Sequence, residues 1–280
     1  MAPEHNRAFS PAIASVRYTF PAVQPGGARP MKVRVLGASG GCAPGCFPTS
    51  FLVDGRLAVD AGAVATQLSL EEQFRVSDVL ITHSHLDHVR DLPLMLINGD
   101  RTKSPLRILS TAETLDAVKR HLFNKEMWFE AFTIPIPMIE ATPVPVGQTT
   151  EIAGYRVTGF ALHHTVQSTG WLLDDGKSAV FIAGDTDQED CLARVSKFAG
   201  SKLKAAFLET SFPNAAKEFA KLTAHLTPEG LGRAAKGLTP GVPLYVTHMK
   251  PGFEDKISAE LASLGNPAIR PVKSGEVIEV

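Results

Sequence analysis

The segment VLITHSHLDHV constrains the fold of this chain more than any other feature, because it places His83, His85, Asp87 and His88 directly after an apolar run. Alternate side chains of an extended segment share a face, so His83, His85 and Asp87 are expected to point one way off the end of a strand, with His88 on the opposite side. Imidazole and carboxylate are ligands for Zn²⁺ and similar cations. The spacing therefore predicts two metal sites that share one loop, and a polar surface turn is the weaker alternative.

Further ligand-type side chains follow apolar strands later in the chain. His163 or His164 comes after VTGFAL, Asp185 after AVFIAG, and His248 after PLYVT. Capping or core hydrogen bonding would explain any one of them alone. Together they indicate a metal centre assembled at the ends of several strands.

Strand and helix patterns begin at Met31 and alternate to the end of the chain. Asp54 and Gly55 suit a tight hairpin turn between SFLV and RLAV, and Thr111 and Thr227 are N-cap candidates for two helices. The proline-interrupted segment FTIPIPMIEATPVPVGQ reads as an edge strand or loop. Hairpins followed by strand–helix units, in two similar halves, predict an α/β fold in which two mixed sheets pack face to face with helices outside. We expect one catalytic domain over residues 31–280, preceded by an N-terminal arm or tail over residues 1–30.

Composition excludes several classes of protein. The chain has 280 residues, 44% of them hydrophobic, and no apolar run approaches the roughly 20 residues of a membrane-spanning helix. Its 28 Lys and Arg balance 29 Asp and Glu, which gives no overall attraction to nucleic acid. Three cysteines, Cys42, Cys46 and Cys191, are too few for a disulfide scaffold, although Cys42 and Cys46 are close enough to pair. With no export signal at the N-terminus, we expect a cytoplasmic protein.

The glycine-rich stretch VRVLGASGGCA is similar to a dinucleotide-binding loop, but such a loop must open a helix that receives the pyrophosphate. Pro44, Pro48 and a further strand follow instead. We interpret these glycines as residues that let a loop pass close to the centre of the fold.

The HSHLDH motif, with His, Asp and His at later strand ends, resembles the metallo-β-lactamase fold, an αββα four-layer sandwich that holds one or two metals. The resemblance implies that His83, His85 and His164 hold one metal, that Asp87, His88 and His248 hold the other, and that Asp185 bridges them. We choose His164 over His163 because HTVQSTGW resembles the tRNase Z pattern around a ligand histidine.

Several stretches resemble more specifically the class II cyclic-nucleotide phosphodiesterases: HLDHV, PLRILSTAETLDAVKRHLFN, LETSFPN, AHLTPEGL and VTHMKP. Two departures are Asp91, where that family has a small residue, and GDTDQED in place of GDTGPD. The resemblance implies hydrolysis of cAMP or cGMP to the 5′-monophosphate with two divalent metals, Zn²⁺ or else Mn²⁺ or Fe. Dimerisation is expected from the resemblance only.

Hydrolysis of a phosphodiester also requires a nucleophile, charge neutralisation and an acid. Two metals would supply the first two through a bridging hydroxide, which Asp87 would also orient. We assign the acid to His225, held by Glu209 as in the tRNase Z-like Glu–His pair; a helix-capping or surface histidine is the alternative. Lys250 would contact the phosphate, and Phe123 and Trp128 would stack on a purine, although core or interface packing is the commoner role of such aromatics.

Two other functions compete with this hypothesis. A tRNase Z-like RNA 3′-processing endonuclease would share the ligands and the Glu–His pair but requires a basic patch. A non-catalytic metal- or ligand-binding module would keep the fold without turnover. We expect a small-molecule substrate, with neither nucleic acid nor membrane as a partner.

Overall fold

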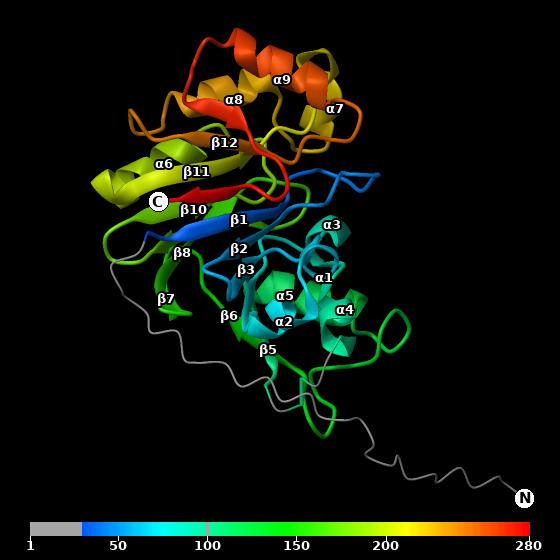
Figure 1. Cartoon of the computed structure of the whole chain (residues 1–280). Coiled ribbons are helices and arrows are strands. Elements are labelled where there is room, and N and C mark those ends of the chain that lie inside the picture. Colours follow the sequence, from blue (N-terminus) through cyan, green and yellow to red (C-terminus); the bar gives the residue numbers. More distant parts are fainter. Residues whose placement is uncertain (1–29, 99–100, 103) are drawn as a thin grey trace, which may run out of the picture.

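Two seven-stranded sheets pack face to face in the computed structural model, which describes residues 30–98, 101–102 and 104–280 (Figure 1). The expected arm therefore lies outside the described residues, apart from its last position. The first sheet has the order β14 (Val277–Glu279), β1 (Lys32–Gly37), β2 (Ser50–Val53), β3 (Leu57–Val59), β4 (Asp78–Leu80), β5 (Leu106–Ser110) and β6 (Ile139–Pro143). The second has the order β13 (Ile269–Pro271), β12 (Leu244–Thr247), β11 (Leu203–Glu209), β10 (Ala179–Ile182), β9 (Ser168–Asp174), β8 (Tyr155–Leu162) and β7 (Thr149–Ile152).

The two sheets repeat one plan. In the first, β14 to β3 pair antiparallel and β3 to β6 pair parallel. In the second, β7 to β10 pair antiparallel and β10 to β13 pair parallel. The proline-interrupted segment supplies β6 at the edge of its sheet, and Asp54 and Gly55 both adopt positive φ, 46° and 71°, in the turn between β2 and β3. These features confirm the prediction of hairpins followed by strand–helix units.

Helices cover the outer faces of both sheets (Figure 1). Those on the first sheet are α1 (Val64–Gln67), α2 (Leu70–Arg75), α3 (Leu86–Val89), α4 (Leu92–Ile97) and α5 (Ala112–His121). The second half of the chain contributes α6 (Cys191–Ala199), α7 (Lys217–Leu222), α8 (Pro228–Ala235) and α9 (Glu254–Ser263), with short 3-10 turns at Gly200–Lys202 and Asn214–Ala216. Thr111 and Thr227 accept a hydrogen bond from a backbone N–H in the first turns of α5 and α8, as expected for N-caps.

Three apolar clusters hold the four layers together, and strand alternation creates them. Along β10, Val180 and Ile182 pack between the sheets, whereas Phe181 points to α6 and α8. Trp171 is fully buried between the sheets, and its indole N–H donates to the carbonyl of Ile81 in the other half at 3.1 Å. The αββα sandwich predicted from the sequence is therefore confirmed.

Candidate metal centre

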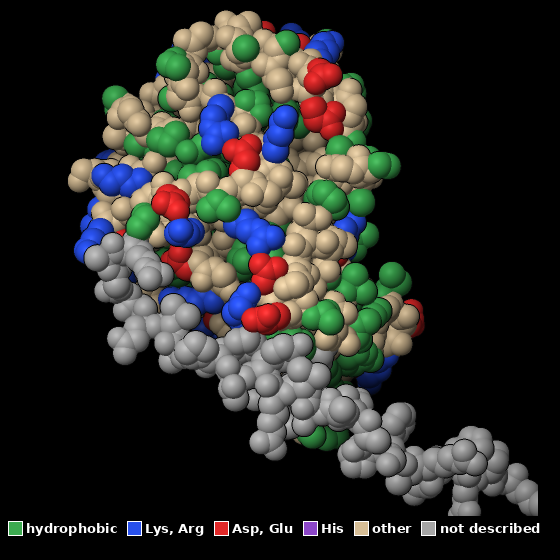
Figure 2. Space-filling model, viewed as in Figure 1, with side chains coloured by type: hydrophobic (Ala, Val, Ile, Leu, Met, Phe, Trp, Pro, Cys, Tyr) green, Lys and Arg blue, Asp and Glu red, His purple; other side chains and the backbone are tan. Residues whose placement is uncertain are grey.

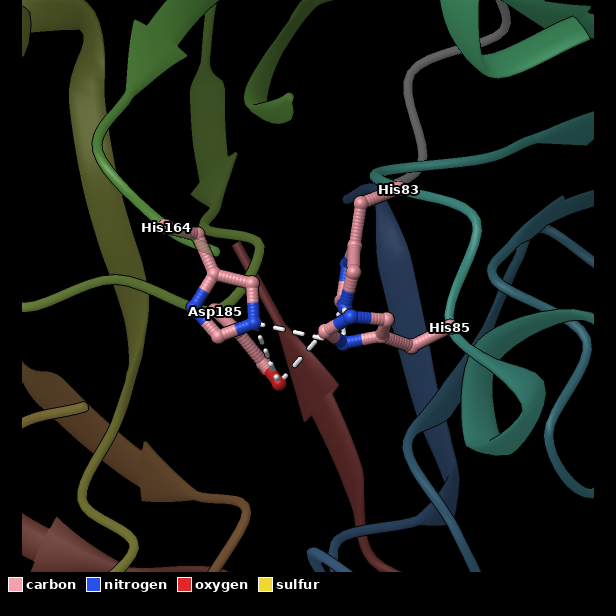
Figure 3. Close-up of side chains that lie close together, drawn as sticks. All are labelled: His83, His85, His164 and Asp185. Carbon is pink, nitrogen blue, oxygen red and sulfur yellow. Dashed lines mark hydrogen bonds and ion pairs between the residues drawn. The ribbon is translucent and has the colours of Figure 1, made fainter. Parts of the chain in front are cut away.

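The ligand-type residues gather where strands of both sheets end. His83 follows β4, His164 follows β8, Asp185 follows β10 and His248 follows β12. Figure 3 shows His83 and His85 facing His164 and Asp185 across the gap between the two halves. The side chains that the sequence predicts to share a site are thus brought together from distant parts of the chain.

The chain does not stay extended through HSHLDH. His85 is the extended N-cap of α3, which begins at Leu86. This helical turn brings His88 back beside His83, and their ring centroids lie 4.1 Å apart. The prediction that His88 points away from His83 is therefore wrong, because strand alternation ends at His85.

The donor atoms form two adjacent groups, and Asp185 of the first group lies beside the second. The first consists of His83, His85, His164 and Asp185, the second of Asp87, His88 and His248, and within each group one donor atom per residue lies within 4.8 Å of the others. Asp185 is buried, and one carboxylate oxygen lies 3.5 Å from His88 Nε2 while the other lies 3.2 Å from His248 Nε2 and 3.7 Å from His83 Nε2. This carboxylate lies close to histidines of both donor groups, which suits it to bridge two ions.

Residues outside the two donor groups form hydrogen bonds with Nδ1 of three histidines, which orients Nε2 of each ring toward the centre. The Nδ1 partners are Asp60 Oδ2 for His88 at 2.6 Å, the Ala224 carbonyl for His164 at 2.9 Å and Ser211 Oγ for His248 at 3.0 Å. The inward Nε2 atoms of His88 and His248 then lie only 3.2 Å apart. In each of these rings the outer nitrogen already has a partner, which leaves the inward Nε2 available to bind a cation. The residues present therefore fit a divalent metal.

Protonation states agree with metal binding. Burial, with the neighbouring His88 charge, holds the pKa of His83 well below its usual value, and burial also lowers the pKa of His85 and His164. Burial alone would raise the pKa of Asp185, but the surrounding histidines outweigh it and hold the pKa well below normal. Neutral imidazoles and an ionised carboxylate are the forms that bind metals. His88 differs from the other three histidines: burial opposes its protonation, but the carboxylates of Asp185 and Asp60 raise its pKa well above the usual value, so a metal would have to displace its proton.

Asp60 is a functional residue that the sequence reasoning missed. It is buried at the end of β3, and its carboxylate accepts hydrogen bonds from the Thr82 amide at 2.7 Å and the Thr82 hydroxyl at 2.8 Å besides holding His88. The available signal was its position directly after the apolar run LAV, the same pattern that marked Asp185. Asp60 fixes both the strand end and the orientation of one ligand.

We expect Asp60→Asn to weaken metal affinity about 10- to 100-fold, because the amide keeps the size of the side chain but orients His88 less firmly. Asn also tolerates the left-handed backbone at this position, where φ is 59°. Competition with a chromophoric chelator measures the affinity, and Asp175→Asn in the exposed β9–β10 turn is the control. Equal affinity in both variants would contradict the role of Asp60.

The neighbouring histidines 163 and 164 differ sharply in environment. His164 is buried with its Nε2 3.3 Å from His85 Nδ1, whereas the exposed His163 pairs with Asp187 at 2.5 Å. We expect His164→Ala to lose metal and His163→Ala to keep it, as measured by elemental analysis of the two purified proteins. Loss of metal in His163→Ala alone would reverse the assignment.

His225 lies beside the donor groups, with its ring engaged by an acidic partner. Its Nδ1 lies 2.6 Å from Glu209 Oε1 and 4.0 Å from Asp185, and Ser211 Oγ lies within 3.1 Å of the same nitrogen. Burial opposes protonation, but the Glu209 carboxylate outweighs it, so the pKa of His225 is raised. Because Asp185, His225 and His248 also form a compact donor group, the geometry allows His225 to serve as an acid or as a ligand.

The two departures from the phosphodiesterase pattern have structural roles. Asp91 is buried at the start of α4 and accepts a hydrogen bond from the Ala65 amide at 2.8 Å. In GDTDQED, Asp187 holds the exposed ring of His163. Neither departure removes a donor from the metal centre.

The predicted substrate contacts have different outcomes. Phe123 is 1% exposed in the cluster between the first sheet and its helices, so the prediction that it stacks on a purine is wrong: its ring packs against Phe132. Trp128 is half-buried against that same cluster. Lys250 follows the ligand-type His248 and Met249, and its amide donates to the Ser211 carbonyl at 3.2 Å. Contacts of Trp128 and Lys250 with substrate stay predictions.

The loop after β1 passes close to the centre, as interpreted from its glycines. A Cβ on Gly40 would lie 2.4 Å from the His248 carbonyl oxygen and 2.8 Å from its Nδ1. The Gly40 amide donates to Met249, and the His248 amide donates to Ala38. Only glycine fits against His248 at this point.

The beta-lactamase superfamily domain matches residues 51–249, and the chain belongs to this superfamily. Its fold is that of the metallo-β-lactamases. At 27% identity over 233 residues it resembles a probable 3′,5′-cyclic-nucleotide phosphodiesterase of Yersinia pestis, covering 72% of this chain and 66% of that protein, just under two thirds of its length. It is 25% identical to 3′,5′-cyclic-nucleotide phosphodiesterase 1 of Saccharomyces cerevisiae, over 72% of this chain and 69% of that one.

Solved structures share the fold. The crystal structure of unliganded yeast PDE1 superposes with a TM-score of 0.76 at 19% identity, over 90% of this chain and 100% of that one. Human tRNase Z, short form, superposes with a TM-score of 0.64 at 18% identity, over 89% and 98% of the two chains. At these identities the likeness establishes the architecture alone.

Proposed function

We propose that this chain is a metal-dependent phosphodiesterase that hydrolyses 3′,5′-cyclic nucleotides to 5′-monophosphates. The observation that carries the proposal is the contact of His225 with Glu209 beside the bridging carboxylate of Asp185. The fold and donor set support a hydrolase that uses divalent metals. The named phosphodiesterases among its relatives support the substrate class.

Two divalent ions, which we propose to be zinc, would supply an activated water and neutralise charge on the phosphoryl oxygens when bound. His83, His85 and His164 would hold one ion, Asp87, His88 and His248 the other, and Asp185 both. Asp87 lies 3.3 Å from His248 Nε2 and is part-exposed, and its carboxylate would also orient the activated water.

His225 would donate the proton to the departing 3′ oxygen. Glu209 holds Nδ1 and favours the protonated ring, while Nε2 has no hydrogen-bond partner among the described residues and is free to face the substrate. Ser211 Oγ contacts Glu209 at 2.9 Å as well as His225 and His248, which couples the acid to the second donor group. The proton would therefore be held on a fixed ring beside the site where the leaving oxygen would develop charge.

A tRNase Z-like endonuclease is the alternative, and the surface charge bears on it. Figure 2 shows Lys and Arg side chains interspersed with Asp and Glu on the face in view, with no continuous basic region there. RNA binding depends on such a region. Over the whole chain, 28 Lys and Arg against 29 Asp and Glu give no overall attraction to RNA, and this balance favours a small-molecule substrate.

A panel assay tests the proposal: metal-loaded protein with cAMP, cGMP, bis(p-nitrophenyl) phosphate and a pre-tRNA, each with and without chelator. We expect turnover of a cyclic nucleotide that the chelator abolishes. Cleavage of pre-tRNA alone would favour the endonuclease. Turnover of none at full metal occupancy would favour a binding module.

The cellular setting is also a proposal. None of the helices in the described ranges has both the length and the apolar character to cross a bilayer. Cys42, Cys46 and Cys191 are free thiols, so the pairing that their spacing allows does not occur here. We propose a cytoplasmic protein that acts on a free cyclic nucleotide, and dimerisation stays a prediction.

A further inference from the structure

Three phenylalanines form an aromatic surface beside His225. Phe212 follows β11, Phe219 lies on α7 and Phe253 is the N-cap residue of α9. The ring centroid of Phe212 lies 5.2 Å from that of Phe219 and 6.3 Å from that of Phe253, both edge-to-face. We call Phe212, Phe219 and Phe253 the aromatic surface.

Packing within the fold does not account for the outer two rings. Phe219 is 53% exposed and Phe253 is 39% exposed, whereas Phe212 beneath them is 8% exposed. None of the three belongs to the apolar clusters that join the four layers in the described part of the chain. The aromatic surface therefore presents ring area to solvent on a buried aromatic support.

The aromatic surface adjoins the proposed acid. The ring centroid of Phe212 lies 5.7 Å from that of His225. Phe253 also closes the turn that begins at Lys250, since its amide donates to the Lys250 carbonyl at 3.0 Å. Phe212 thus contacts both outer rings and the proton donor, and the backbone of Phe253 contacts that of the lysine predicted to contact phosphate.

Reaction geometry determines which side of the centre the nucleoside occupies. In a 3′,5′-cyclic nucleotide the leaving oxygen stays attached to the ribose, and the ribose carries the base. Because the acid must contact that oxygen, the ribose and base must lie on the His225 side of the phosphorus. Exposed aromatic rings on that side are the kind of surface on which a base stacks.

A cavity beside His225 is less suited to a base than the aromatic surface. It has a volume of about 340 Å³ and is lined by the opposite face of α7, with Lys217 and Lys221, and by Asp187 and Glu189. Its lining combines charged side chains of both signs with the apolar side chains of Ala220 and Leu226, and contains none of the phenylalanines. The aromatic surface provides the flat apolar rings.

We propose that the aromatic surface binds the nucleobase of the substrate, with Phe219 and Phe253 as the stacking residues and purines preferred for their larger ring area. This inference rests on the proposed function and names its base-binding site, in place of Phe123. The base contact contributes to binding and not to the chemical step, so its loss should raise KM and leave kcat nearly unchanged.

The test compares Phe219→Ala and Phe253→Ala with Phe198→Ala, which removes a phenylalanine of similar exposure, 57%, from α6. For zinc-loaded protein we expect each of the first two variants to raise KM for cAMP about tenfold. We expect kcat to change less than about twofold. A ribose 3′,5′-cyclic phosphate without a base should show no such change, and Phe198→Ala should match the parent protein. Unchanged KM for cAMP, or equal losses with and without the base, would overturn the inference.

A binding measurement keeps this test separate from the proposed function. In zinc-loaded protein carrying His225→Ala, the fluorescence of 2-aminopurine riboside 3′,5′-cyclic phosphate should be quenched on binding, and adding Phe219→Ala should weaken that binding about tenfold. Quenching without turnover in the parent protein would count against the proposed function alone. Turnover of cAMP without any effect of Phe219 or Phe253 on binding would count against the aromatic surface alone.

Discussion

Replacing His225 with alanine is expected to lower kcat for a cyclic nucleotide about 100-fold or more while metal content stays at the parent level. Removing a positioned acid costs about this much when the leaving group is an alkoxide. His225 is 9% exposed and held at Nδ1 by Glu209, so its loss removes the proton source, and circular dichroism verifies that the fold persists. Steady-state kinetics together with elemental analysis measure both effects.

The same pair of measurements separates the two roles that the geometry allows for His225. Loss of a metal equivalent in His225→Ala would make it a ligand, since Asp185, His225 and His248 lie close enough to share an ion. Parent-level turnover would remove it from the mechanism. The matched control is His121→Ala, because His121 is exposed at the end of α5, far along the chain from every donor residue.

Replacing Asp185 with asparagine is expected to remove most of the bound metal and to reduce turnover to the level seen with chelator. Asp185 contacts His83, His88 and His248, so one substitution weakens both donor groups. An uncharged amide also withdraws the negative charge that offsets two cations. Elemental analysis gives metal per chain, and circular dichroism verifies that the fold persists.

The control for Asp185→Asn is Asp116→Asn, which makes the same chemical change at an exposed pair with Arg120 on α5. This control should retain both metal and activity. If Asp185→Asn kept full metal occupancy, the carboxylate would not bridge, and the two donor groups would have to bind their ions independently.

The ligand-type side chains could be placed at strand ends because each follows an apolar run. His83, Asp185 and His248 were placed in this way, and the αββα architecture followed from the repeated order of hairpins and strand–helix units. Local patterns suffice there, since strand period and turn chemistry act over a few residues.

Long-range contacts determine the side-chain positions that local sequence patterns could not predict. The turn of α3 depends partly on the Ala61 amide, which donates to the His88 carbonyl at 2.7 Å, so strand alternation could not anticipate the position of His88. Asp60 follows β3 and reaches His88 only through the fold. Phe123 follows the end of α5, and Phe219 lies on the short helix α7. Only the packing around them determines that the first is buried and the second exposed.

The most direct test of the proposed activity is phosphorus NMR of cAMP incubated with zinc-loaded protein, with and without chelator. We predict conversion to 5′-AMP that requires metal, because the acid beside Asp185 would protonate the 3′ oxygen. Formation of 3′-AMP, or no turnover of cAMP or cGMP at full metal occupancy, would contradict the proposal.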